Sequence, residues 1–158
     1  MYPTRILLVT DGSPDSWTAV ETAVGLAAGT SSELHVAHAI STVPPMPYPS
    51  AFGKEAGETV LGRLRLAALA LLDEKVGQVE KLGCAVAGSH YREGVRPADE
   101  VLLLAEKIGA GLIVTASRSL RDPGRPFAAR NFASEIYRRA DCPVIVVRTQ
   151  DTEQAPGS

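Results

Sequence analysis

Four arginines lie close together in a stretch of the sequence where an α/β protein would bind a phosphate. The stretch covers residues 117–130 and follows an apolar run at 112–116. The four are Arg118, Arg121, Arg125 and Arg130. Phosphate loops use glycine because it allows positive φ and lets backbone N–H groups approach the anion. This loop has one glycine, Gly124, and one acid, Asp122, so it carries a net charge of +3.

The arginine loop has two interpretations. Arginine can chelate phosphate oxygens with two donors, and the N-terminus of a following helix attracts anions, so side chains could replace the glycines. Most connecting loops, however, are exposed and mobile. We therefore favour a solvated surface loop over a dedicated phosphate site.

Apolar runs typical of buried strands alternate with helical patterns along the chain. Strands are predicted at residues 5–10, 33–40, 84–91, 112–116 and 143–148. Helices are predicted from residue 14 onwards and over 55–82, 97–108 and 131–140. Ser13 is the expected N-cap of the first helix, with Pro14 as its first residue. A proline-rich loop is expected at 41–53.

This alternation predicts one α/β domain over residues 1–148, with a flexible polar tail at 149–158. Its five-stranded parallel sheet has helices on both faces, and we expect the strand order 3-2-1-4-5. In this order the winding reverses between the first and fourth strands, where ligands bind at the carboxyl ends. Asp11, Gly12 and Ser13 should then lie beside Ala116, Ser117 and Arg118.

Composition and charge exclude several classes of protein. A net charge of −2 over 158 residues argues against a nucleic-acid partner. No apolar run approaches the ~20 residues that span a bilayer, so no membrane partner is expected. Two cysteines and an N-terminus without a signal-peptide pattern predict a cytoplasmic protein.

Other reactive side chains show no catalytic or metal-binding pattern. His35, His38 and His90 have no ligand spacing with acids or cysteines, so we predict core histidines and no metal site. Cys84 and Cys142 fall on opposite edges of the predicted sheet, roughly 19 Å apart, which is too far for a disulfide. We find no positioned general base, activated nucleophile or nucleotide motif, and therefore name no catalytic residue.

Several segments together resemble the universal stress protein family. They are "ILLVTDGSPDS", "ELHVAHAI", "YREGVRPADEVLLLAEKIGAGLIV" and "SEIYRRADCPVIVVR". Their order and spacing cover about residues 4–148, although the turn at 94–97 is one residue longer than the family's Gly-x-Pro. The resemblance implies a Rossmann-like sheet of the adenine-nucleotide alpha hydrolase type, in the strand order argued above.

The resemblance also implies a dimer, often formed by antiparallel pairing of the last strand. The residues concerned are Pro143, Val144, Ile145, Val146, Val147 and Arg148. An exposed apolar edge strand is an aggregation risk, and pairing with the same strand of a second copy in a twofold dimer would cover it. The alternative is that the tail at 149–158 folds over this edge. We favour the dimer.

Many members of this family bind ATP through a Gly-x2-Gly-x9-Gly-Ser/Thr motif after the fourth strand, and members without it do not. Here Ala116 and Ser119 occupy the first two glycine positions. Arg130 and Asn131 occupy the closing pair, after ten residues (120–129) in place of nine. The motif is absent, so no cofactor is expected.

Individual positions of the family's cleft can still be matched. Asp11 corresponds to an aspartate that helps to hold the nucleoside, but it is equally an ordinary helix entry signal. Arg130 either fills the phosphate pocket or binds an anion, Asn131 can cap the helix, and Phe132 should pack inward. The matched cleft comprises Asp11, Gly12, Ser13, Ala39 (at a position that contacts adenine), Ala116, Ser117, Arg118, Ser119, Arg130, Asn131 and Phe132.

We therefore predict a cytoplasmic dimer with a stress-response role that acts through protein partners. The alternative function is binding of ATP or another anionic small molecule by Asp11 and the loop at 117–130. An enzyme, such as a weak ATPase, is the least favoured interpretation.

Overall fold

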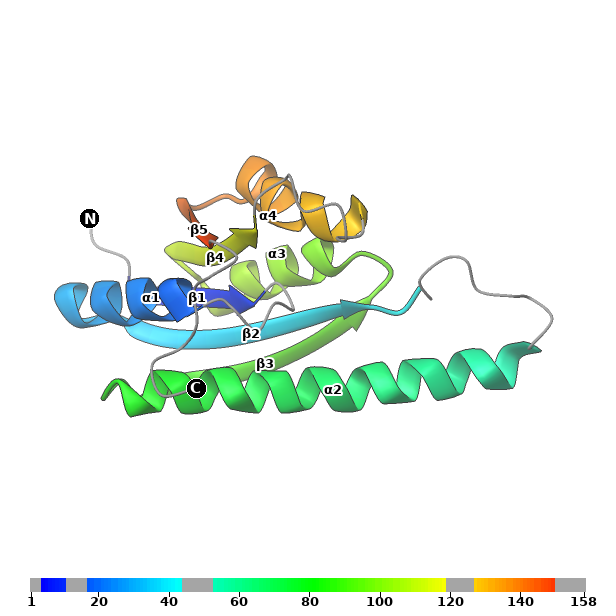
Figure 1. Ribbon diagram of the computed structural model, residues 1–158. Coiled ribbons are helices and arrows are strands. Elements are labelled where there is room, and N and C mark those ends of the chain that lie inside the picture. The colour runs from blue at the N-terminus through cyan, green and yellow to red at the C-terminus, as the bar shows by residue number, and fades with distance from the viewer. Residues whose placement is uncertain (1–3, 11–16, 44–52, 119–126, 150–158) are drawn as a thin grey trace.

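The computed structural model describes residues 4–10, 17–43, 53–118 and 127–149 (Figure 1). Strands and helices alternate along the whole described chain. The strands are β1 (Arg5–Thr10), β2 (Glu33–Ser41), β3 (Val86–Gly94), β4 (Leu112–Arg118) and β5 (Val144–Thr149). The helices are α1 (Trp17–Thr30), α2 (Gly53–Lys81), α3 (Pro97–Ile108) and α4 (Phe127–Arg139).

The five strands form one parallel sheet in the order β3-β2-β1-β4-β5, which confirms the predicted topology. β1 lies at the centre, between β2 and β4. Its four inner residues, 6–9, are at most 2% exposed, as expected for an apolar strand covered on both faces.

Alternation along each strand divides the core into two layers. Ile6 and Leu8 join a cluster with side chains of α1 and α2. Leu7 and Val9 join a second cluster with side chains of α3 and α4. The two clusters lie on opposite faces of the sheet because successive side chains of a strand point to opposite sides.

β3 extends further than the sequence predicted. The expected strand was 84–91, but β3 continues to Gly94, which pairs with Ser41 of β2. The Thr42 N–H donates to the Gly94 carbonyl at 2.8 Å. Glu93 and Gly94, which were expected to form a turn, therefore belong to the β2–β3 ladder, because Ile40 and Ser41 of β2 pair with them.

α4 begins four residues earlier than predicted, at Phe127 instead of residue 131. Two alanines follow Phe127, and alanine has the highest helix propensity. Ser13 and Pro14, the expected start of the first helix, lie outside the described residues, as does the tail from residue 150. Among the described helices, none is long and apolar enough to cross a membrane.

α3 has well-defined ends. Pro97 is its first residue, and Gly109 follows its last turn in the left-handed conformation with φ 69°. The Gly109 N–H reaches the carbonyl oxygens of Ala105 and Glu106, which would otherwise be unpaired at this end. The helix is thus fixed over the sheet at both termini.

Adjacent leucines on α3 test the assigned core. Leu104 is 2% exposed and Leu103 is 61% exposed. We expect Leu104→Ala to lower the free energy of unfolding by about 2–5 kcal/mol, because it leaves a cavity over the sheet. Leu103→Ala, the matched control, should change it by less than about 0.5 kcal/mol. Urea unfolding measures both, and equal losses would contradict the assigned packing.

Candidate functional site

The carboxyl ends of β1 and β4 lie side by side at the centre of the sheet. Val9 pairs with Thr115, so Thr10 ends β1 close to Ala116 and Ser117 of β4. This is the point where the winding direction reverses, as the predicted strand order requires.

Part of the predicted cleft lies outside the described residues, namely Asp11, Gly12, Ser13 and Ser119. For Arg118, Arg130 and Asn131 the structure describes the backbone only. Arg118 is the last residue of β4 and pairs with Thr149, the last residue of β5. The arginine loop therefore leaves the sheet beside the end of β5.

The backbone of α4 corrects the expected role of Asn131. A capping residue must precede the helix, because its side chain accepts hydrogen bonds from N–H groups of the first turn. α4 begins at Phe127, so Arg130 and Asn131 are its fourth and fifth residues. Asn131 therefore does not cap this helix.

Two alanines of the predicted cleft belong to different layers of the core. Ala116 is 1% exposed and packs in the cluster that contains Ala19 and Val20 of α1. Its methyl group fills the core beneath α1. Ala39 is 8% exposed and packs in the cluster on the opposite face, with Ala98 of α3. The structure does not bring these two methyl groups to one surface.

Phe132 packs inward, as predicted. It is half-buried and lies against the α3/α4 cluster that contains Ile136, one turn further along α4. Ser117, at the end of β4, is also half-buried. Phe132 therefore anchors α4 to the sheet, which is a structural role.

A buried polar pair lies at the end of β1, next to the point where the winding direction reverses. Thr10 Oγ1 and His38 Nδ1 are 2.6 Å apart and hydrogen-bonded, and both side chains are buried. His38 is thus a hydrogen-bonded core histidine, as predicted. On the adjacent strand, Thr115 Oγ1 is buried and has no hydrogen-bond partner among the described residues.

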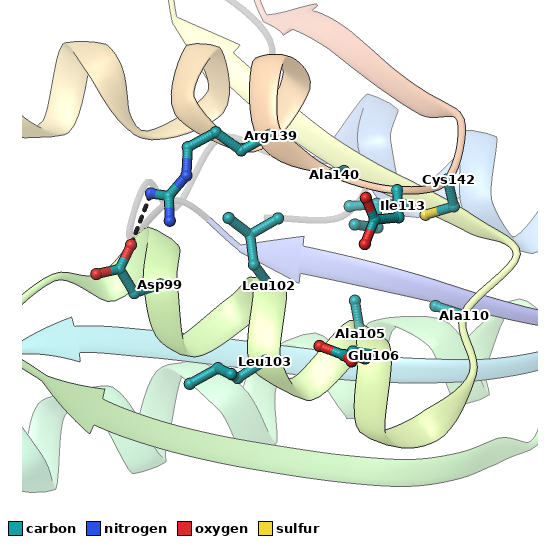
Figure 2. Close-up of a pocket in the computed structure, with 11 residues that line it drawn as sticks. Asp99, Leu102, Leu103, Ala105, Glu106, Ala110, Ile113, Arg139, Ala140 and Cys142 are labelled. Atoms are coloured by element: carbon teal, nitrogen blue, oxygen red, sulfur yellow. Dashed lines mark hydrogen bonds and ion pairs between the residues drawn. The ribbon is translucent and has the colours of Figure 1, made fainter.

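The sequence did not reveal a cavity of about 410 Å³ between α3 and α4. Figure 2 shows the Asp99–Arg139 ion pair, 2.6 Å long, on one side of it. Leu102, Ile113 and Cys142 contribute apolar or weakly polar surface. Ile113 is near the start of β4 and Cys142 precedes β5, so the cavity lies at the amino ends of these strands. It is therefore distinct from the predicted cleft.

Neither cysteine shows the features of a reactive thiol. Cys84 and Cys142 are free and half-buried. Burial raises the pKa of both thiols, and the Asp141 carboxylate raises that of Cys142 further. A thiol with a raised pKa stays protonated at neutral pH and is a poor nucleophile.

The described part of the chain contains no cluster of three or more His, Cys, Asp and Glu side chains that could hold a metal ion. His35 and His90 nevertheless lie together, with Nδ1 of His35 3.0 Å from Nε2 of His90. They are 55 residues apart in the sequence, and only the β2–β3 pairing makes them neighbours.

Comparison with known proteins agrees with this architecture. The model of the universal stress protein family matches residues 3–148. A universal stress protein solved in complex with cAMP is 21% identical, with 95% of this chain and 100% of that one covered and a TM-score of 0.62.

Two further structures show the same fold. A protein of the universal stress protein family from Burkholderia pseudomallei is 23% identical, with 91% of this chain and 95% of that one covered and a TM-score of 0.62. The Archaeoglobus fulgidus universal stress protein in complex with dAMP is 18% identical, with 93% and 99% covered and a TM-score of 0.63.

The two buried threonines near the ends of β1 and β4 give a matched test of hydrogen bonding at this place. Thr10→Val removes the hydrogen bond to His38 and should lower the free energy of unfolding by about 1–3 kcal/mol. Thr115→Val removes a hydroxyl that lacks a partner among the described residues, so stability should be unchanged or higher by about 1 kcal/mol. Chemical denaturation distinguishes them, and a loss of similar size in both variants would show that Thr115 is also hydrogen-bonded.

Proposed function

Because this chain belongs to the universal stress protein family, we propose that it is a cytoplasmic homodimer that acts through protein partners in a stress response. In this proposal the protein is not an enzyme, and it does not bind ATP as members with the glycine motif do. The start of α4 is the observation that carries the proposal.

The closing positions of the motif lie inside a helix. Only the first four N–H groups of an α-helix lack an intrahelical partner and can be offered to an anion. Asn131 is the fifth residue of α4, so its N–H falls within the helical hydrogen-bond pattern. Arg130, the fourth residue, carries a long side chain where the family motif has none. Backbone binding of a triphosphate is therefore disfavoured at this end of the loop.

A second candidate function is binding of a nucleotide with a single phosphate. The structures from relatives that contain cAMP and dAMP favour it. Such a ligand has no β- and γ-phosphates and so does not need the glycine motif that would bind them. The loop at 117–130 has a net charge of +3 from its four arginines and Asp122. Arginine side chains could then bind the one phosphate group.

Thermal unfolding with nucleotides tests both candidates. With millimolar Mg-ATP or GTP we expect no shift in Tm, because the glycines of the family's ATP-binding motif are missing. A ligand at 100 times its Kd adds about 2.7 kcal/mol, which would raise Tm by roughly 5–10 °C in a domain of this size. Such a rise with ATP would contradict the proposal.

AMP and cAMP are measured in the same series. A rise with either, but not with ATP, would establish the second candidate function in place of the first. Asp11→Ala and Arg118→Ala should then each reduce the shift, because both belong to the matched cleft. An unreduced shift in both variants would place the nucleotide elsewhere.

The homodimer is supported by the free edge of β5. β5 is the last strand in the sheet order, and no described strand pairs with its outer side. The Ile113 N–H donates to the Pro143 carbonyl at 3.0 Å, so Pro143 faces β4. Backbone groups alternate along a strand. The N–H and C=O groups that point outward are those of Val144, Val146 and Arg148.

A twofold axis at Val146 would satisfy all of these groups in one register. Val146 would then face its own symmetry mate, and Val144 would face Arg148 of the partner subunit. Residues 144–147 are half-buried in the single chain, and antiparallel pairing would cover them further.

Opposite charges at Val146 test this register. Directly opposed residues of antiparallel strands have Cβ atoms about 4.5–5.5 Å apart, so like charges there repel. Val146→Lys and Val146→Glu should each be monomeric in sedimentation experiments, and an equimolar mixture should recover the dimer mass. Leu66→Lys, on the exposed surface of α2, is the control and should remain dimeric. Dimers in both single variants would exclude this interface.

A further inference from the structure

We propose that the cavity between α3 and α4 binds a small organic cation, namely an amine that carries an apolar group. The cavity lies at the amino ends of β4 and β5, on the face of the sheet that α3 and α4 cover. The proposal is independent of the proposed function, because the predicted cleft lies at the opposite, carboxyl ends of the strands. The size of the cavity, its apolar floor, its charges and the helix ends beside it each support an amine.

The cavity is large enough for a small molecule and has an apolar interior. Its volume of about 410 Å³ falls within the range of about 300–1,000 Å³ that is usual for ligand pockets. Figure 2 shows Leu102 and Ala105 pointing from α3 toward α4. Ile113 of β4 forms the floor, and Ala110 and Ala140 add two methyl groups. Apolar walls with a few polar groups are typical of sites for small molecules.

The charged residues of the cavity favour a positively charged ligand. Its lining has three acids, Asp99, Glu106 and Asp141, and one described basic residue, Arg139, which gives a net charge of −2. Arg139 is already paired, because its Nη1 donates to Asp99 Oδ1 at 2.6 Å. Glu106 and Asp141 form no hydrogen bond or ion pair with another described side chain. These two carboxylates can therefore accept hydrogen bonds from an ammonium group.

The ends of α3 and α4 add to the negative potential at the cavity. The carboxyl end of an α-helix carries a partial negative charge, which attracts cations. α3 ends at Ile108, and Glu106 lies in its last turn. α4 ends at Arg139, and Asp141 is the second residue after it. An acid at this end of a helix is unfavourable for stability. A bound cation would give both carboxylates a role that their helices do not.

Other classes of ligand fit the cavity less well. An anion would meet a net negative charge, because Arg139 is held by Asp99. A metal ion needs several ligands close together, and the described residues contain no group of three His, Cys, Asp and Glu side chains that could hold one. Lys107 is next to Glu106 in the sequence but does not line the cavity. The apolar floor favours an amine with a hydrophobic group over a small hydrophilic amine.

Four probe molecules separate the contribution of charge from that of apolar surface. 2-Phenylethylamine has an ammonium group and a ring, 2-phenylethanol has the ring without the charge, phenylacetate has the opposite charge, and ethylamine lacks the ring. The full chain is titrated with each at pH 7.5 by calorimetry. We expect one molecule of 2-phenylethylamine per chain, bound at least tenfold more tightly than the other three. Equal affinity for 2-phenylethanol, or no binding of millimolar 2-phenylethylamine, would overturn the proposal.

Cys142 reports where the amine binds without any substitution. Its thiol lines the cavity, whereas Cys84 precedes β3 at the other edge of the sheet and is an internal control. Saturating 2-phenylethylamine should slow the reaction of Cys142 with methyl methanethiosulfonate at least fivefold and leave that of Cys84 unchanged. Peptide mass spectrometry measures both rates. An unchanged rate at Cys142 would place the amine outside the cavity and overturn the proposal.

Substitutions that keep the size of the side chain test the two carboxylates. Glu106→Gln and Asp141→Asn should each weaken 2-phenylethylamine binding at least threefold, and the double variant at least tenfold. Glu80→Gln, on the exposed surface of α2, removes the same charge elsewhere and should bind as the wild type does. Ala140→Leu keeps every charge but fills part of the cavity, so it should also weaken binding at least tenfold.

Melting curves without ligand confirm that each variant folds. Glu106 and Asp141 are exposed, so their amide variants should fold as the wild type does. Wild-type affinity in the double variant would show that the amine binds at another place, and would overturn the proposal.

Discussion

The pairing of β1 with β4 is the constraint on which the rest of the structure depends. It joins residues more than a hundred positions apart and reverses the direction in which the sheet is wound. Both strands are buried on two faces, so neither could lie at an edge without exposing apolar side chains. This pairing divides the helices into two layers and aligns the ends of the strands at the centre of the molecule.

The sequence was sufficient for the topology because the signals involved are local. Apolar runs such as residues 5–10 are typical of strands buried on both faces, and their alternation with helices leaves few strand orders. Helix ends were predictable where glycine or proline marks them, as Pro97 and Gly109 do for α3. The start of α4 was missed although Pro126 immediately precedes Phe127, because the helix was predicted from the four-residue spacing of Phe132, Ile136 and Ala140, which begins at Phe132.

The site was less predictable, for physical reasons that differ between residues. Ala116 was matched to a phosphate loop by position, but the face of β4 on which its methyl lies depends on the strand register. His35 and His90 gave no signal because their proximity depends on a ladder between distant strands, and on an irregularity in that ladder after Leu34. The cavity between α3 and α4 likewise arises from how two helices pack, and no single segment encodes it.

The central position of β1 has a consequence for synthesis on the ribosome. The segment from β1 to β3 emerges first, and its three strands can pair as the β3-β2-β1 half of the sheet. Until residue 112 has been made, β1 is an apolar edge strand with unpaired backbone groups on one side. Arg5 reaches the Ile108 carbonyl at 3.2 Å, a contact between residues 103 positions apart that forms at the same late stage. The nascent chain therefore presents a strongly hydrophobic strand to chaperones, or to other nascent chains, until β4 has been made.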